Sequence, residues 1–262
     1  MQFLTQEEGG PVALENPGAR GRVVLVCEHA SRRMPRALGT LGLSEDVLAS
    51  HIAWDPGALA VAKRLSASLD ATLVHQRFSR LGYDCNRPPE SPAAMPEKSE
   101  VFDVPGNRGL DQAARDARTE ALYLPFRAAL ADLVRTRIAE GRAPVLVTIH
   151  SFTPVYFGKP RAVEIGILHD TDSRLADAML AAGEGGRYDI RRNEPYGPED
   201  GVTHTLKEHA IANGLANVMI EVRNDLVRDA AGEAAVADYL THLLREGLSS
   251  LERENGGARS HA

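Results

Sequence analysis

Three strand-like segments of this 262-residue chain each run into a side chain that can bind a metal ion or move a proton. The three side chains are His29 after residues 22–27, His150 after residues 144–149, and Glu221 after residues 216–220. Ligands of open α/β sheets bind beyond the carboxyl ends of the strands, so these side chains would converge if the strands are neighbours. Two imidazoles beside a carboxylate indicate metal-assisted hydrolysis.

The two histidines repeat one arrangement, because each follows a buried strand and has a serine close behind it. Neutral imidazole is the commonest zinc ligand, and catalytic zinc takes three protein ligands and one water, so a third ligand is needed. Asp55 is the first candidate, since it stands at a turn just before a helix, although an aspartate before Pro56 is equally typical of a helix N-cap. Glu28 is the second candidate, but it can share a metal with His29 only if the strand has already ended, because adjacent strand residues point to opposite faces.

Glu221 follows an apolar strand, where a carboxylate is costly to bury unless it is paired. It is therefore either bonded to Arg223 or Arg80 or retained as a general base beside zinc-bound water. Arg223 could instead pair with a substrate carboxylate. His204 is a candidate pocket residue, but with His209 five positions later it does not form a metal pair on one helix face.

Arg87 is a candidate for binding a substrate carboxylate. It stands directly before two prolines, which would fix it as a two-pronged donor, and Asn86 adds a neutral donor beside it. The alternative is a structural ion pair of Arg87 with Asp84 or Asp103. This segment leads into a proline-rich stretch, 87–105, that predicts a long surface loop, and loops of this length are often functional.

The elements that must position these residues alternate along the chain. Strand-like runs are expected at about 22–27, 71–77, 144–149, 163–168 and 216–222, and helical patterns at about 58–69, 111–140, 173–183, 203–213 and 232–247. This alternation predicts an α/β fold with a largely parallel sheet covered by helices. We expect residues 1–262 to form one domain, with loosely held ends up to about residue 20 and from about residue 254.

Composition narrows the classes of function. A net charge of −6 argues against a general nucleic-acid binder, and no apolar run has membrane-spanning length. Residues 1–10 lack the features of a secretion signal, so the cytoplasm is the default expectation. Only Cys27 and Cys85 are present, too few for a disulfide scaffold.

Several short segments together resemble the N-formylglutamate amidohydrolase family, which is similar in fold and site layout to zinc carboxypeptidases and aspartoacylase-type deacylases. They are Cys-Glu-His-Ala-Ser at 27–31, Trp-Asp-Pro-Gly-Ala at 54–58, Ser-Arg at 79–80, Asp-Cys-Asn-Arg-Pro at 84–88, Ile-His-Ser-Phe at 149–152, Gly-Val-Thr-His-Thr-Leu at 201–206 and Glu-Val-Arg-Asn-Asp-Leu at 221–226. The resemblance implies a three-layer α/β/α sandwich with a mixed, mostly parallel sheet, as in zinc carboxypeptidases, and a single zinc ion. It also implies that His29 and His150 are metal ligands, that Glu221 is the general base and that Asn86 and Arg87 hold a substrate carboxylate.

The first functional expectation is therefore a zinc-dependent amidohydrolase that removes a formyl or other small acyl group from the nitrogen of an acidic amino acid, such as N-formylglutamate. Arg87, together with Arg80 or Arg223, would orient the carboxylates. One alternative is a carboxypeptidase or amidase that acts on peptide or cell-wall fragments. Another is a protein that binds a small ligand without catalysis. Neither a nucleic-acid nor a membrane partner is expected, and the sequence gives no oligomeric state.

Overall fold

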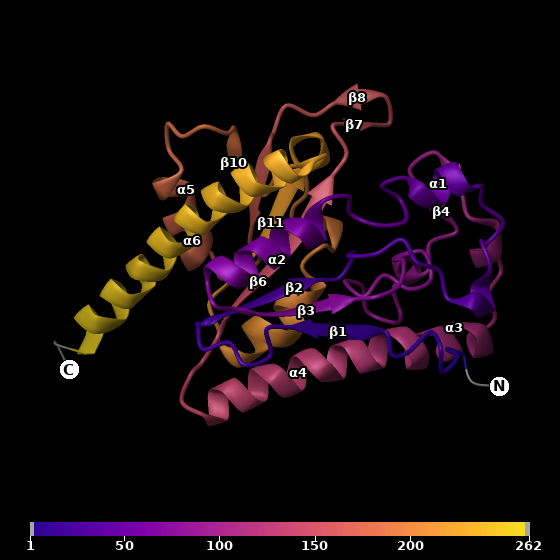
Figure 1. The fold of residues 1–262 in the computed structure, drawn as a ribbon, viewed down its shortest axis with the longest axis horizontal. Coiled ribbons are helices and arrows are strands. Elements are labelled where there is room, and N and C mark those ends of the chain that lie inside the picture. Colours follow the sequence, from indigo (N-terminus) through magenta and orange to yellow (C-terminus); the bar gives the residue numbers. More distant parts are fainter. Residues whose placement is uncertain (1–2, 260–262) are drawn as a thin grey trace.

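Runs of β-branched and other apolar residues form a central sheet in the computed structural model of the protein, which describes residues 3–259 (Figure 1). Within these residues the sheet has seven strands, in the order β1-β3-β2-β6-β11-β9-β10. Their bounds are β1 Val12–Glu15, β2 Val23–Cys27, β3 Thr72–Gln76, β6 Val145–Phe152, β9 Ile165–Leu168, β10 Ile190–Arg192 and β11 Asn217–Arg223. The five strands expected from the sequence are all present.

The sheet is mixed and mostly parallel, as predicted. Strands β3, β2, β6 and β11 run parallel to one another, whereas β1 at one edge is antiparallel to β3. At the other side β9 is antiparallel to β11 and parallel to β10. The three strands that lead into His29, His150 and Glu221 are thus adjacent and parallel, so their carboxyl ends lie side by side at the same end of the strands.

Helices cover both faces of the sheet and make three layers (Figure 1). The helices α2 (Ala58–Ser68), α5 (Arg174–Ala182) and α6 (Ala230–Arg259) pack on one face, against alternate strand residues such as Leu25, Val147 and Ile220. Helix α4 (Leu124–Ala139) and the π-helical turn Leu206–Ala210 pack on the other face, against the intervening strand residues. Both faces of the central strands are therefore buried, which explains their continuous apolar sequence.

Two expected helices differ in detail. The helix expected at 111–140 is divided into α3 (Gln112–Arg118), a π-helical turn (Thr119–Tyr123) and α4. Pro125, which has no amide hydrogen to donate, lies in the first turn of α4 and accounts for the interruption. The helix expected at 203–213 is instead the π-helical turn 206–210 followed by a short 3₁₀ turn, Ile211–Asn213.

The chain ends are more regular than the expectation of loose tails. Strand β1 lies within the first 20 residues and pairs with β3. At the other end α6 continues to Arg259, and the rest of the expected tail, 260–262, lies outside the described residues. Within residues 3–259, no helix is both long and apolar enough to span a membrane.

Short elements fill the connections near the carboxyl edge of the sheet. They are helix α1 (Glu45–Ala49), the hairpin of β4 (Lys98–Ser99) with β5 (Phe102–Asp103), and the hairpin of β7 (Val155–Tyr156) with β8 (Lys159–Pro160). The proline-rich stretch 87–105 is mainly loop, as expected, and includes β4 and β5.

Candidate metal centre and pocket

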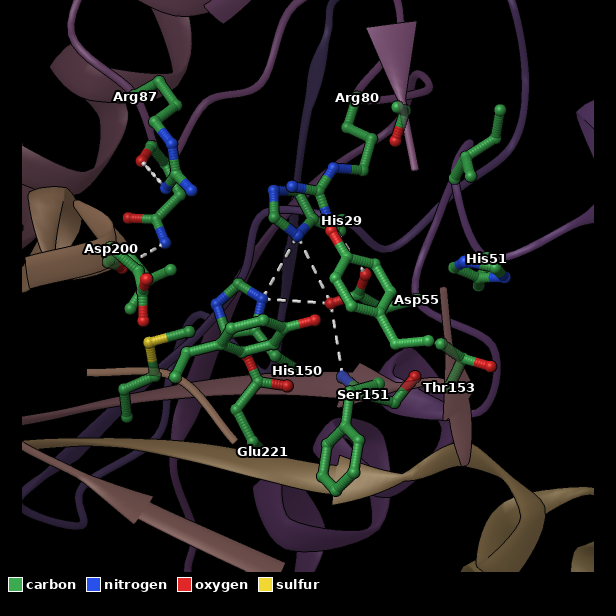
Figure 2. Close-up of a pocket in the computed structure, with 18 residues that line it drawn as sticks. His29, His51, Asp55, Arg80, Arg87, His150, Ser151, Thr153, Asp200 and Glu221 are labelled. Carbon is green, nitrogen blue, oxygen red and sulfur yellow. Dashed lines mark hydrogen bonds and ion pairs between the residues drawn. The ribbon is translucent and has the colours of Figure 1, made fainter. Parts of the chain in front are cut away.

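The central strands bring three of the predicted residues together (Figure 2). His150 in β6 and Glu221 in β11 are register partners on adjacent parallel strands, so their side chains project from the same face. His29 follows the end of β2, the strand on the other side of β6. These three side chains line a cavity of about 360 Å³, within the size range of small-molecule sites.

Asp55 joins the two histidines. Its backbone N–H donates to the carbonyl of His29 over 2.9 Å, which ties the turn before α2 to the end of β2. Gly57 follows in a left-handed conformation, with φ of 79°, and a Cβ there would lie 2.4 Å from a methyl group of Val227. A glycine at position 57 thus allows the tight turn that directs the Asp55 side chain toward the two histidines.

Three potential ligand atoms meet in this cluster. Oδ2 of Asp55 lies 3.2 Å from Nδ1 of His29 and 3.0 Å from Nδ1 of His150, and the two Nδ1 atoms are 3.2 Å apart. All three residues are buried. Of the two candidates for the third ligand, Asp55 is the one that lies between the histidines, and Glu28 lies elsewhere, at the opposite nitrogen of His150.

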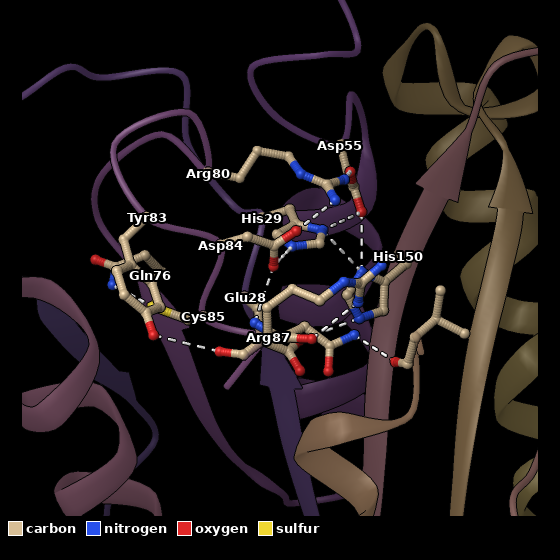
Figure 3. Close-up of polar contacts among 12 residues, drawn as sticks. Glu28, His29, Asp55, Gln76, Arg80, Tyr83, Asp84, Cys85, Arg87 and His150 are labelled. Carbon is tan, nitrogen blue, oxygen red and sulfur yellow. Dashed lines mark hydrogen bonds and ion pairs between the residues drawn. The ribbon is translucent and has the colours of Figure 1, made fainter. Parts of the chain in front are cut away.

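Each histidine is held from behind by a buried carboxylate (Figure 3). Nε2 of His29 donates to Oδ1 of Asp84 over 2.7 Å, and Nε2 of His150 lies 3.2 Å from Oε2 of Glu28. A carboxylate at one imidazole nitrogen fixes the tautomer and makes the other nitrogen a better ligand. From the sequence, Glu28 was the second candidate for the third ligand and Asp84 one of two alternative ion-pair partners of Arg87, and neither supporting role was predicted.

The carboxylates dominate the electrostatics of the cluster. Burial lowers the pKa of His150, but Glu28 and Asp55 outweigh it and raise that pKa well above its usual range. Burial and Arg80 lower the pKa of His29, yet the neighbouring aspartates raise it overall. Burial raises the pKa of Asp55, but the two histidines hold it far below its usual range. The carboxylates thus make the cluster a favourable place for positive charge.

The donor set fits a zinc ion. A tetrahedral zinc with ligands at about 2.0–2.1 Å holds its ligand atoms about 3.3 Å apart, close to the separations among these three atoms. Two imidazole nitrogens and one carboxylate oxygen, with a further carboxylate behind each imidazole, match the catalytic zinc sites that leave a fourth position for water. The three residues would therefore require little rearrangement to hold the ion.

Glu221 stands beside this cluster without a partner of its own. Its side chain is buried, and its Oε2 atom has no hydrogen-bond partner among the described residues. Neither Arg80 nor Arg223 pairs with it, although the sequence analysis allowed both. Burial raises the pKa of Glu221 to about 7, against the lowering effect of His150. A carboxylate with this pKa is suited to accept and return a proton near neutral pH.

The predicted substrate-binding arginines have different surroundings. Arg80 lines the cavity, but its guanidinium lies 2.6 Å from Asp84 and 3.4 Å from Asp55, so its charge is already neutralised. Arg87 also lines the cavity, and its guanidinium makes one hydrogen bond, to the backbone carbonyl of Asn86, among the described residues. Arg87 is thus the predicted residue best placed to bind an anion.

The contacts of Asn86, Arg223 and His204 differ from the substrate-binding roles expected for these residues. The amide of Asn86 lines the cavity but is engaged at both ends, since it donates to the Val202 carbonyl over 2.5 Å and accepts from the Thr205 N–H over 3.0 Å. The guanidinium of Arg223 lies outside the cavity lining and is bound by Asp225, Glu164 and the backbone carbonyls of residues 161 and 162. His204 also lies outside it and contacts the Tyr123 hydroxyl over 2.8 Å.

The remaining cavity wall was not predicted. It includes the aromatic residues Phe152, Tyr156 and Tyr196, together with His51, Ser99, Thr153 and Asp200. Phe152 is the last residue of β6, and the others come from loops and short elements whose positions no local pattern specifies. Residue 99 could have been suspected only because it lies in the proline-rich loop, and residues 153 and 156 only because they closely follow His150.

Comparison with known proteins identifies the family of the chain. The sequence profile of the N-formylglutamate amidohydrolase family matches residues 21–228, which include all the residues of the cluster. No curated protein sequence matches the chain.

Two solved structures are similar to this fold. The gene product Atu2144 from Agrobacterium tumefaciens is 63% identical, with a TM-score of 0.94 over 95% of this chain and 99% of its own. The N-formylglutamate amidohydrolase from Ralstonia eutropha JMP134 is 20% identical, with a TM-score of 0.67 over 93% of this chain and 99% of its own. The second likeness shows that the α/β fold is shared.

Proposed function

Because the chain belongs to the N-formylglutamate amidohydrolase family, we propose that it is a zinc-dependent enzyme that removes a formyl or other small acyl group from the nitrogen of an amino acid. One observation carries this proposal. Potential ligand atoms of His29, Asp55 and His150 lie within 3.2 Å of one another, next to the unpartnered carboxylate of Glu221. A metal centre beside a free general base is the arrangement that amide hydrolysis requires.

The chemistry divides between the ion and the side chains. A zinc ion held by these three ligands would act as a Lewis acid toward the acyl carbonyl and would lower the pKa of a water molecule in its fourth position. Glu221 takes a proton from the attacking water and returns it to the leaving amine nitrogen, so the two proton transfers balance. Asp84 and Glu28 hold the imidazole rings in place throughout.

Arg87 orients the substrate in this proposal. Its guanidinium faces the cavity with most of its N–H groups free of described acceptors, and a guanidinium binds a carboxylate through two parallel hydrogen bonds. The α-carboxylate, which every N-acyl amino acid carries, is the group it would hold. Asn86 supports this by fixing the segment 202–205 against the loop that bears Arg87.

Two substitutions test the assignment. Glu221→Gln keeps the size of the side chain but cannot accept the proton, so it should retain zinc and lose about 10²- to 10⁴-fold in turnover. His150→Ala removes a ligand and should lose the metal itself. Zinc content by mass spectrometry and turnover of formyl amino acids are the two readouts, with the exposed Glu184→Gln as the matched control. Full activity in either site variant would overturn the proposal.

A further inference from the structure

The cavity offers a substrate little positive charge outside the metal centre. Among the described residues that line it, Arg80 is neutralised by Asp55 and Asp84, and Arg87 is the arginine with no carboxylate within 4 Å. Arg223, which the sequence assigned to a substrate carboxylate, is bound by Glu164 and Asp225 outside the cavity. The cavity lining therefore has one arginine available, enough for one carboxylate.

Asp200 lies at one end of the cavity, and His51, which is paired with Glu100 behind it, lies at the other. Figure 2 places Asp200 on the side of Arg87 and His51 on the opposite side. Asp200 accepts a hydrogen bond from the N–H of Gly197 and has no cation within 4 Å among the described residues. His51 lies 2.9 Å from the carboxylate of Glu100, whose side chain is 10% exposed. A second substrate carboxylate would therefore meet the like charge of Asp200 at one end and a histidine already paired with Glu100 at the other.

The wall between these ends is aromatic. Phe152, Tyr156 and Tyr196 line the cavity, and the guanidinium carbon of Arg161 lies 5.6, 4.3 and 4.7 Å from their respective ring centroids. Arg161 is not itself part of the lining, so it holds the three rings by cation–π contacts from outside. Such a wall offers an apolar surface on which an aliphatic or aromatic side chain can be buried.

We propose that the pocket selects N-acyl amino acids that have a single carboxylate and an uncharged, aliphatic or aromatic side chain. Arg87 holds the α-carboxylate, and the side chain packs on the wall formed by Phe152, Tyr156 and Tyr196. This inference rests on the proposed amidohydrolase function and departs from the acidic substrate expected from the sequence. It concerns the side chain of the substrate alone, so the two proposals can fail separately.

A matched pair of substrates provides the test. N-formylglutamine and N-formylglutamate differ in the charge of the side chain but hardly in its shape. With zinc-loaded protein, we expect kcat/KM for N-formylglutamine to exceed that for N-formylglutamate by about tenfold or more, the scale that one unfavourable charge contact produces. N-formylleucine and N-formylphenylalanine should also exceed the glutamate compound. Equal or better hydrolysis of N-formylglutamate would overturn this inference, whereas hydrolysis of neither these four compounds nor their N-acetyl counterparts would overturn the proposed function.

Two variants test which residues determine the preference among N-formyl amino acids. Tyr156→Ala should raise KM for N-formylphenylalanine more than for N-formylalanine, because only the larger side chain reaches the wall. Tyr188→Ala, from a ring pair outside the cavity, is the matched control, and thermal melts confirm folding. An unchanged ratio of the two KM values in Tyr156→Ala would contradict the inference.

Arg161→Met should leave the preference for N-formylglutamine over N-formylglutamate intact. A selective loss of N-formylglutamate turnover in this variant would show that Arg161 binds a second carboxylate and would overturn the inference.

Discussion

Oε2 of Glu28 lies 3.2 Å from Nε2 of His150, and both side chains are buried. His150 presents its other nitrogen to Asp55 and His29, and the nearby Glu28 carboxylate favours a hydrogen on Nε2 of His150, which leaves Nδ1 free to act as a ligand. Glu28 thus sits behind a potential ligand, whereas the sequence made it the second candidate, after Asp55, for the third ligand.

The first prediction concerns this supporting carboxylate. Glu28→Gln should weaken zinc binding about 10- to 100-fold, because the amide no longer raises the basicity of the imidazole. Competition with a zinc chelator of known affinity measures the effect, and circular dichroism verifies the fold. Glu184→Gln, an exposed exchange of the same kind, should bind zinc as the parent protein does. An unchanged affinity in Glu28→Gln would show that this contact does not tune the site.

The second prediction concerns Asn86. Its side chain bonds the carbonyl of Val202 and the N–H of Thr205, and a buried backbone group that loses its partner costs about 1–3 kcal/mol. Asn86→Ala should therefore lower the free energy of unfolding by about 2–4 kcal/mol, measured by urea denaturation. Asn213→Ala removes a single bond from an exposed amide and should cost less than about 1 kcal/mol. Equal costs for the two variants would contradict the positioning role of Asn86.

The sequence predicted the framework of the site well, for a physical reason. The central strands are buried on both faces, so β2, β6 and β11 read as continuous apolar runs, and the polar residues that end them stand out. The convergence of His29 and His150 then follows from parallel pairing of neighbouring strands.

The pairing of charges could not be predicted in the same way. Arg80 and Arg223 both lie near the expected site in sequence, yet one is held by Asp55 and Asp84 and the other by Glu164 and Asp225. Asp84 and Asp225 are only four and two residues from their arginines, whereas Asp55 and Glu164 are far away in the chain, and no local pattern shows which acids an arginine will meet. The strand β1 was missed for a related reason, since it is short, lies at the sheet edge and has a partly exposed sequence without clear alternation.

The third prediction concerns pH. Burial lowers the pKa of His209 to about 4 in the folded protein, from an ordinary value of 6.5. His209 of the unfolded chain therefore binds a proton more tightly than His209 of the folded protein. As the pH falls from 6.5 toward 4, protonation of His209 favours the unfolded chain and lowers the free energy of unfolding, whereas above pH 6.5 there is no such loss. The full loss amounts to about 3 kcal/mol.

The variant His209→Gln should lose less stability over this pH range than the parent protein. Urea denaturation at several pH values with a chelator present measures the difference without interference from bound metal. His242→Gln, at an exposed histidine, is the control and should follow the parent curve. If the curve of His209→Gln also ran parallel to the parent curve, His209 would not be the source of the acid sensitivity.

The last prediction concerns the loop and the hairpin that adjoin the cavity. Glu100 accepts the N–H of Phe157 over 2.8 Å and lies 2.9 Å from Nε2 of His51, so one carboxylate joins the loop 97–103 to the tip of the β7–β8 hairpin. Glu100→Ala should release the hairpin, because each lost bond contributes about 0.5–1.5 kcal/mol to holding it. Hydrogen exchange of residues 155–160 should become faster and KM should rise, since Tyr156 on this hairpin lines the cavity.

Two further variants serve as controls. Glu100→Gln keeps an acceptor for the Phe157 N–H and should recover part of the protection from exchange. Asp103→Ala removes an acid from the same loop that pairs with Arg108 instead, and should change neither quantity. Equal exchange in Glu100→Ala and Asp103→Ala would mean that the hairpin is held by its own turn rather than by Glu100.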